Sequence, residues 1–211
     1  ALAQWNAVAT STLRLNVGTP LALDYTAINF ANVFNDFGDG INPVLFDSDG
    51  SIIDALLGAG QKNNVLGFAG SSYFLNGPSG GKFSEGRAVL NGFINVSDGV
   101  LTNVVAHEIG HFFGMDHTQL DATQGLAQSN FALMYPIAYR TLPVLHEDDA
   151  ATVSTLYPAA SFAGTYGQMT GTFVTPGGAP ILGANLWAHE TGTGKVYSVV
   201  SDYLMQGTGF F

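Results

Sequence analysis

Hydrophobic positions recur at helical spacing in two long stretches of the chain. In the first, the apolar residues that share one helical face are Leu101, Val104, Val105, Ile109 and Phe112. This stripe predicts an amphipathic helix over about residues 101–113, which begins after a turn at residues 97–99. In the second stretch, acidic residues 147–149 suit the positive end of a helix dipole and Pro158 stops the helix. We therefore expect a second helix over residues 145–158.

Shorter patterns flank these two helices. Residues 1–9 predict the end of an amphipathic helix, and residues 52–57 predict a short helix closed by Gly58. Alternating or wholly apolar runs predict strands at 12–17, 42–46, 65–70 and 87–96. Residues 71–86 are rich in Ser, Gly and Asn, which favours a loop. The first three quarters of the chain therefore mix helices and strands.

The pattern changes after an expected linker at residues 159–164. Three alternating segments predict strands at 169–174, 184–189 and 195–200. Glycine-rich turns join them, at residues 176–178 and 191–194. The chain therefore divides into an expected domain over residues 1–160 and a smaller all-β region over residues 165–211.

Composition and charge exclude several classes of partner. Hydrophobic residues make up 46% of the 211 positions, which is enough to bury a sizeable core. Six Lys and Arg residues stand against sixteen Asp and Glu residues, so the formal net charge is -10. So few cations cannot form the basic surface that nucleic acids or anionic membranes require. No apolar run is long enough to span a bilayer, and no membrane insertion is expected. There is no cysteine, and the oligomeric state stays open.

Three histidines and a glutamate stand close together in the sequence. On a helix, His107 and His111 lie one turn apart on the same face and can bind one metal ion. Gly114 accepts the left-handed conformation that ends a helix, and the turn brings His117 back as a third nitrogen ligand. Three protein ligands with one open position are typical of a catalytic zinc site. The alternative is an amphipathic helix that carries histidines by chance.

This stretch resembles a known family signature. The pattern H-E-x-x-H-x-x-G-x-x-H, here His107 to His117, is that of the metzincin peptidases. Residues 132–136, Ala-Leu-Met-Tyr-Pro, resemble the methionine turn of the matrixin branch, and the helix with Asp148 and Asp149 resembles the one that ends a matrixin catalytic domain. The resemblance implies an α+β zincin fold for residues 1–160. Its parts are a twisted, mostly parallel sheet with an antiparallel edge strand, an active-site helix and a C-terminal helix.

The resemblance also assigns roles to residues. It implies one catalytic zinc ion held by the three histidines, Glu108 as the general base, and Met134 as an apolar floor beneath the metal. Residues of the edge strand would pair with an extended peptide substrate: Leu66, Gly67, Phe68 and Ala69. The wall of the specificity pocket would include Pro136 and Tyr139. Asp148 and Asp149 are expected to accept backbone hydrogen bonds behind the site.

The chain also departs from the family pattern. If residue 1 lies in the first helix, the first strand of a matrixin is missing. Phe68 stands where a ligand of a structural zinc would be, and His146 and His189 are the only histidines outside the signature. No second zinc is therefore expected. Residues 165–211 resemble the start of a carboxypeptidase-regulatory-like, or transthyretin-like, β-sandwich without its final strands.

A second metal and two classes of function remain open. Asp47 and Asp49 suggest a calcium-binding loop, although aspartate before glycine is also a common turn former. The resemblance implies a secreted or cell-surface zinc endopeptidase that hydrolyses proteins or peptides. The alternative is a non-enzymatic extracellular surface or adhesion protein that uses the zincin fold as a scaffold. Glu108 favours the enzyme, because a scaffold needs zinc ligands at most.

Overall fold

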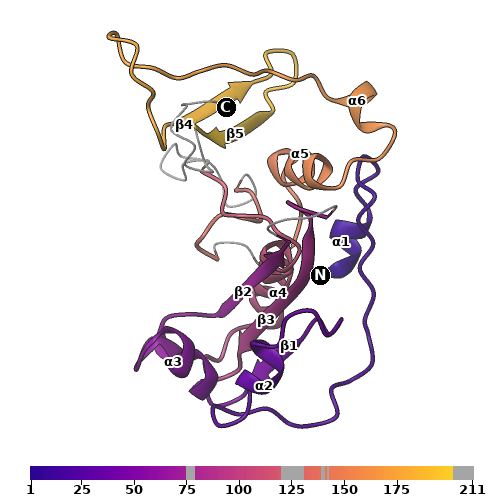
Figure 1. Cartoon of the computed structure of the whole chain (residues 1–211), viewed down its shortest axis with the longest axis vertical. Coiled ribbons are helices and arrows are strands. Elements are labelled where there is room, and N and C mark those ends of the chain that lie inside the picture. The colour runs from indigo at the N-terminus through magenta and orange to yellow at the C-terminus, as the bar shows by residue number, and fades with distance from the viewer. Residues whose placement is uncertain (75–78, 120–130, 139–140, 142, 202–211) are drawn as a thin grey trace. The chain divides into compact units, whose positions relative to one another are not determined.

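The computed structural model describes residues 1–74, 79–119, 131–138, 141 and 143–201. Contacts divide the chain into two units, each described here by itself. The first consists mainly of Leu15–Asp116, and the second combines Trp5–Arg14 with most of the chain from His117 onward. The elements of both units are labelled in Figure 1. The domain boundary expected near residue 160 stays a prediction.

A three-stranded sheet forms the centre of the first unit. Its strands are β1 (Val44–Asp47), β2 (Gly67–Tyr73) and β3 (Phe83–Asn91), in the order β1-β3-β2. β1 pairs with β3 in parallel, and β2 pairs with β3 antiparallel. The antiparallel edge strand is therefore confirmed, but the sheet is mixed rather than mostly parallel in the part of the chain that the structure describes.

Two boundaries of this sheet differ from the sequence prediction. The loop predicted at residues 71–86 is shorter, because β2 continues to Tyr73 and β3 begins at Phe83. Polar residues in this part pair across the two strands, as Ser72 does with Glu85. The strand predicted at residues 12–17 is wrong. Its start pairs instead with the chain after the last long helix, through an isolated bridge from Ser11 to Pro158.

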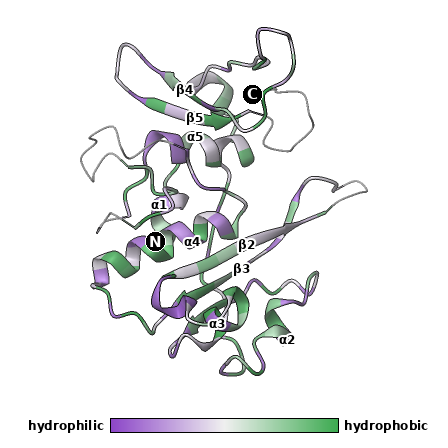
Figure 2. Ribbon diagram, turned by 90° about the vertical axis from the view of Figure 1, so that its left-hand side faces the viewer, coloured by the Kyte–Doolittle hydropathy of each residue, from purple (hydrophilic) through white to green (hydrophobic). Residues whose placement is uncertain are grey.

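Helix α4 (Asp98–Phe112) packs along β2 and β3 (Figure 2). Its first turn is capped by Ser97, whose side-chain oxygen accepts a hydrogen bond from the Val100 N–H at 3.4 Å. At the other end, β3 crosses α4 at Gly86, where an added Cβ would overlap the Phe112 carbonyl oxygen. Glycine at position 86 thus allows the close approach of strand and helix.

A small apolar core of the first unit packs helices against strands β1 and β3. Its helical elements are α2 (Ala31–Phe34), α3 (Ser51–Leu57) and the 3-10 helix η1 (Gln61–Asn63). Its buried residues are Phe30, Val33, Phe34, Leu45, Ile52, Ile53 and Val89. Gly58, with φ of 109°, ends α3 as the sequence predicts. This core joins β1 and β3 to the helices.

The second unit contains helices and a two-stranded sheet. Its elements are α5 (Glu147–Leu156), α6 (Phe162–Thr165), β4 (Asn185–His189) and β5 (Val196–Val200). β4 and β5 are antiparallel and confirm two of the three predicted strands. The third, at 169–174, does not form a continuous strand among the described residues: Thr172 and Val174 lie in isolated bridges, and Val174 pairs with Pro180. The expected linker at 159–164 contains the start of α6.

The N-terminal helix and the membrane question complete the fold. Helix α1 (Leu2–Asn6) confirms the helical pattern of the first residues, and Trp5 is fully buried. After it, the Thr12 N–H donates to the Tyr157 carbonyl oxygen at 2.8 Å, and the Ala159 N–H donates to that of Thr10 at 2.9 Å. Among the described residues, no helix is both long and apolar enough to cross a bilayer.

Candidate metal centre

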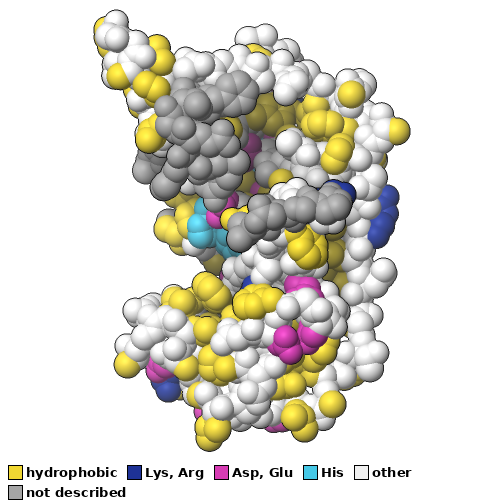
Figure 3. Space-filling model, in the orientation of Figure 1, with side chains coloured by type: hydrophobic (Ala, Val, Ile, Leu, Met, Phe, Trp, Pro, Cys, Tyr) yellow, Lys and Arg dark blue, Asp and Glu magenta, His cyan; other side chains and the backbone are white. Residues whose placement is uncertain are grey.

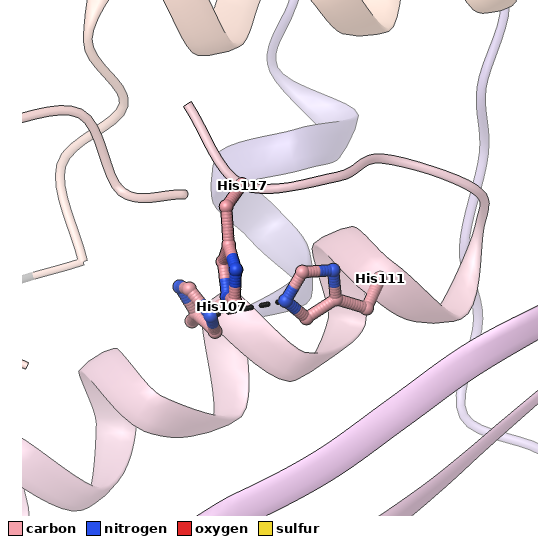
Figure 4. A group of neighbouring side chains, drawn as sticks. All are labelled: His107, His111 and His117. Carbon is pink, nitrogen blue, oxygen red and sulfur yellow. Dashed lines mark hydrogen bonds between the residues drawn. The ribbon is translucent and has the colours of Figure 1, made fainter. Parts of the chain in front are cut away.

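Three histidine side chains converge at the end of α4 (Figure 4). The Nε2 atoms of His107 and His111 lie 3.1 Å apart, and their rings meet edge to face. His117 follows in the loop after the helix, and one nitrogen from each ring lies within 4.8 Å of the others. The three-ligand group expected from the sequence therefore forms.

The backbone at the end of α4 explains how the third histidine returns. Gly114 has φ of 107°, the left-handed conformation that favours glycine. The Gly114 N–H donates to the His111 carbonyl oxygen, and the Met115 N–H donates to that of Gly110, both at 3.0 Å. These bonds close the helix and reverse the chain toward His117.

The hydrogen bonding of His111 sets its tautomer. Its Nδ1 lies 2.8 Å from the Met115 carbonyl oxygen, which can only accept, so Nδ1 carries the proton. Nε2 then presents its lone pair toward His107. Burial lowers the pKa of His111, while the Met115 bond acts in the opposite direction. Burial therefore favours the neutral form of His111, which is the form that binds metal.

The group fits a zinc ion by donor type and by spacing. A tetrahedral zinc with Zn–N bonds of about 2.0–2.1 Å holds its ligand atoms about 3.3 Å apart, close to the 3.1 Å between His107 and His111. His107 and His111 are partly buried and His117 is exposed. Histidine side chains also reach the surface in Figure 3. Solvent can therefore approach the ligands.

Glu108 is buried beside the sheet rather than part of the histidine group. It is 6% exposed, and its side chain lies against Gly67 of β2. A Cβ at Gly67 would come within 2.6 Å of the Glu108 Cγ and 2.8 Å of its Oε1, so the glycine leaves room for the carboxyl. Desolvation raises the pKa of Glu108 to about 8 in the metal-free chain. A cation bound nearby would favour its ionised form.

The expected substrate-binding residues fall in different places. Gly67, Phe68 and Ala69 belong to the edge strand β2, and Phe68 is 37% exposed. Leu66 immediately precedes this strand, and its carbonyl oxygen accepts from the Asn91 N–H of β3 at 2.9 Å. Pro136, the last residue of the expected methionine turn, is exposed. Tyr139 lies outside the described residues.

Three of the five residues expected to form the methionine turn are buried, and one carboxylate accepts hydrogen bonds from the backbone of two of them. Met134 is 1% exposed. Asp149 accepts hydrogen bonds from the backbone N–H groups of Leu133, Met134 and His146 at 2.7, 3.0 and 2.8 Å. Burial raises the pKa of Asp149 to about 6, against the effect of these three bonds. Asp149 thus bonds the backbone as expected, and His146 caps α5 through its Nδ1.

The sequence patterns did not predict the role of two residues that hydrogen-bond next to the third histidine. Thr118 and Ser198 both contact the Asp148 carboxylate, at 2.6 Å from the Thr118 Oγ1 and 2.7 Å from the Ser198 N–H. Thr118 could have been suspected, because it directly follows His117. No signal in the sequence places Ser198 near it, since the two are 80 residues apart.

The two aspartates considered for calcium accept hydrogen bonds from backbone N–H groups in the first turn of α3. The Asp47 Oδ2 accepts from the Ile53 N–H at 2.8 Å, and the Asp49 Oδ1 accepts from the Ser51 N–H at 3.0 Å. The Lys62 ammonium lies 3.4 Å from the Asp49 carbonyl oxygen. Within the described ranges, the cluster of three or more metal-binding side chains is the histidine group, without these aspartates. Calcium here stays a prediction.

No family model matches the chain, and no curated protein matches it. The structure therefore supports a three-histidine group that could bind a metal such as zinc, in an α+β fold with a mixed sheet and a separate two-stranded sheet.

Proposed function

We propose that this chain is a zinc metalloendopeptidase, similar to the matrixin branch of the metzincins, that hydrolyses peptide bonds in proteins or peptides. The observation that carries the proposal is the convergence of three imidazoles from His107, His111 and His117 within 4.8 Å. The buried carboxyl of Glu108, next in sequence to the first of them, supports hydrolysis rather than metal storage.

The residues of the chain divide the work of the reaction. A zinc ion bound by the histidines would supply Lewis acidity and lower the pKa of a water molecule to about 7. Glu108 accepts the proton of the attacking water and later donates it to the leaving amine. Burial raises the pKa of Glu108 to about 8 in the metal-free chain, and a cation bound nearby would lower it, so that the ionised carboxylate can accept a proton.

The edge strand β2 gives the substrate a place to bind. β2 pairs with β3 on one side only, among the described strands. The backbone groups on its other side can add an extended peptide as a further strand. Gly67 in this strand lies against Glu108, so a peptide paired there passes close to the general base. Substrates are thus extended segments, and we infer a secreted or cell-surface location from the family resemblance.

A peptide-library experiment tests this function. The purified chain is incubated with a mixed peptide library, with and without a zinc chelator, and the products are identified by mass spectrometry. Cleavage that disappears with the chelator and returns with added zinc supports the proposal. Stoichiometric zinc without any cleavage, or the absence of bound zinc after gentle purification, would favour the scaffold alternative.

A further inference from the structure

One buried carboxylate joins three distant parts of the second unit. Asp148, in the first turn of α5, is 5% exposed. Its Oδ2 accepts from the Thr118 Oγ1 at 2.6 Å, and its Oδ1 accepts from the Ser198 N–H in β5 at 2.7 Å. The Thr118 and Ser198 hydroxyl oxygens are themselves 3.0 Å apart, and that of Ser198 lies 3.3 Å from the Asp148 Oδ2.

Thr118 is fixed at two points, immediately after a metal-ligand candidate. Its backbone N–H donates to the Met134 carbonyl oxygen at 3.0 Å, and its hydroxyl donates to Asp148. Thr118 is 8% exposed, whereas His117 is exposed. The residue that directly follows the candidate ligand is thus anchored through both its backbone and its side chain.

We propose that Thr118, Asp148 and Ser198 form a positioning network for His117, so that the β4–β5 hairpin helps to hold the third zinc ligand. The inference rests on the proposed zinc site. A ligand on a loop loses conformational freedom when it binds metal, and a network that has already fixed the loop reduces that loss. Hydrogen-bonded groups behind metal ligands typically change metal affinity by about 10–100-fold.

The hairpin has a second attachment to α5, which makes the network separable from the fold. The Val196 N–H donates to the Glu147 Oε1 at 3.1 Å. Replacing Ser198 with alanine removes only its hydroxyl and leaves both this bond and the Ser198 N–H bond to Asp148. If Asp148 served only to attach the hairpin, such a change would leave zinc affinity untouched.

Zinc affinity of full-length variants tests the network directly. Affinity is measured by competition with a chromogenic chelator, and the ligand geometry by the visible absorption of the cobalt-substituted protein. We expect Thr118→Val to weaken zinc binding by about 10–100-fold and to change the cobalt spectrum. Thr118→Ser keeps the hydroxyl and should restore wild-type affinity. Ser198→Ala should weaken binding in the same direction by about threefold, because the hydroxyl contacts with Thr118 at 3.0 Å and with Asp148 at 3.3 Å are lost.

The matched control is Thr155→Val, on the exposed side of α5, where the hydroxyl only donates to the Ala151 carbonyl oxygen. It should leave zinc affinity and the cobalt spectrum unchanged. Wild-type protein that fails to bind zinc contradicts the proposed site itself. Wild-type binding with equal affinity in folded Thr118→Val overturns the network alone. If Thr118→Val does not fold, Ser198→Ala decides, and unchanged affinity there overturns the inference.

Discussion

The candidate zinc ligands are held in two different ways. His107 and His111 project from α4, a 15-residue helix with a buried face against the sheet, so the helix backbone fixes their spacing. His117 lies on a loop and is exposed. Directly after it, Thr118 donates its hydroxyl hydrogen bond to Asp148 and its N–H to the Met134 carbonyl oxygen, and Asp149 accepts from the Met134 N–H. Local geometry thus prepares two ligands, whereas long-range contacts prepare the third.

The largest expected effect is on the rate of peptide cleavage, and it comes from replacing Glu108, the proposed general base. Glu108→Ala should keep zinc and lower kcat/KM for peptide cleavage by about 10²–10⁴-fold, because general-base catalysis is lost. Zinc content and cleavage rate are measured on the same preparation. Glu190→Ala, at an exposed position, should cleave like the wild type. An undiminished rate in Glu108→Ala would refute the proposed mechanism.

A second substitution removes the carboxylate that accepts hydrogen bonds from Leu133, Met134 and His146. Asp149→Ala removes the acceptor of three backbone N–H groups, two of them buried, at about 1–3 kcal/mol each. The free energy of unfolding should therefore fall by about 3–5 kcal/mol, as measured by chemical denaturation of the metal-free chain. Asp24→Ala, at an exposed loop position, should change it by less than about 0.5 kcal/mol. Equal stability of the two variants would show that Asp149 does not hold the methionine turn.

The pH dependence of stability should reflect one buried carboxyl on α4 and one on α5. Folding raises the pKa of Asp149 from 3.8 to about 6 and that of Glu108 from 4.5 to about 8. Each group binds its proton more tightly when folded, so its stabilising contribution is full below the unfolded pKa and is lost as pH rises toward the folded pKa. Between pH 5 and 8, the metal-free chain should lose about 3–5 kcal/mol of stability.

Glu108→Gln separates the two contributions, because it removes the group that titrates up to pH 8. The decline above pH 6 should disappear in this variant, while the decline below pH 6 persists. Denaturation curves at pH 5, 6, 7 and 8 give the comparison. A wild-type stability that rises steadily across this range would contradict the burial of both carboxyls.

The smallest effect concerns the packing of the helix side. Gly86→Ala places a methyl group against the Phe112 backbone at the end of α4 and should cost about 1–3 kcal/mol. Gly70→Ala, in the neighbouring strand with open space around it, is the matched control and should be tolerated. The measurement is thermal unfolding with and without zinc. Equal melting temperatures for the two variants would mean that strand and helix can separate at no cost.

The same contrast explains what the sequence could and could not predict. The helix that carries His107 and His111 was predictable because its apolar stripe and the Ser97 cap are local signals. The strand expected at 12–17 failed because residues 10–12 pair with residues 157–159, which no local pattern reveals. The contact from Ser198 to Asp148 spans 50 residues and carries no motif. Periodicity thus predicted the helical ligands, but not the contacts that support the loop.

The open side of β2 has a consequence beyond substrate binding. Its seven residues, Gly-Phe-Ala-Gly-Ser-Ser-Tyr, include no charge that would oppose pairing with another strand. An extended peptide and the β2 strand of a second molecule therefore compete for the same backbone groups. In concentrated preparations, we expect self-association through this strand, and a bound peptide inhibitor should suppress it. Measurements of self-association and of peptide inhibition would then both depend on the open edge of β2.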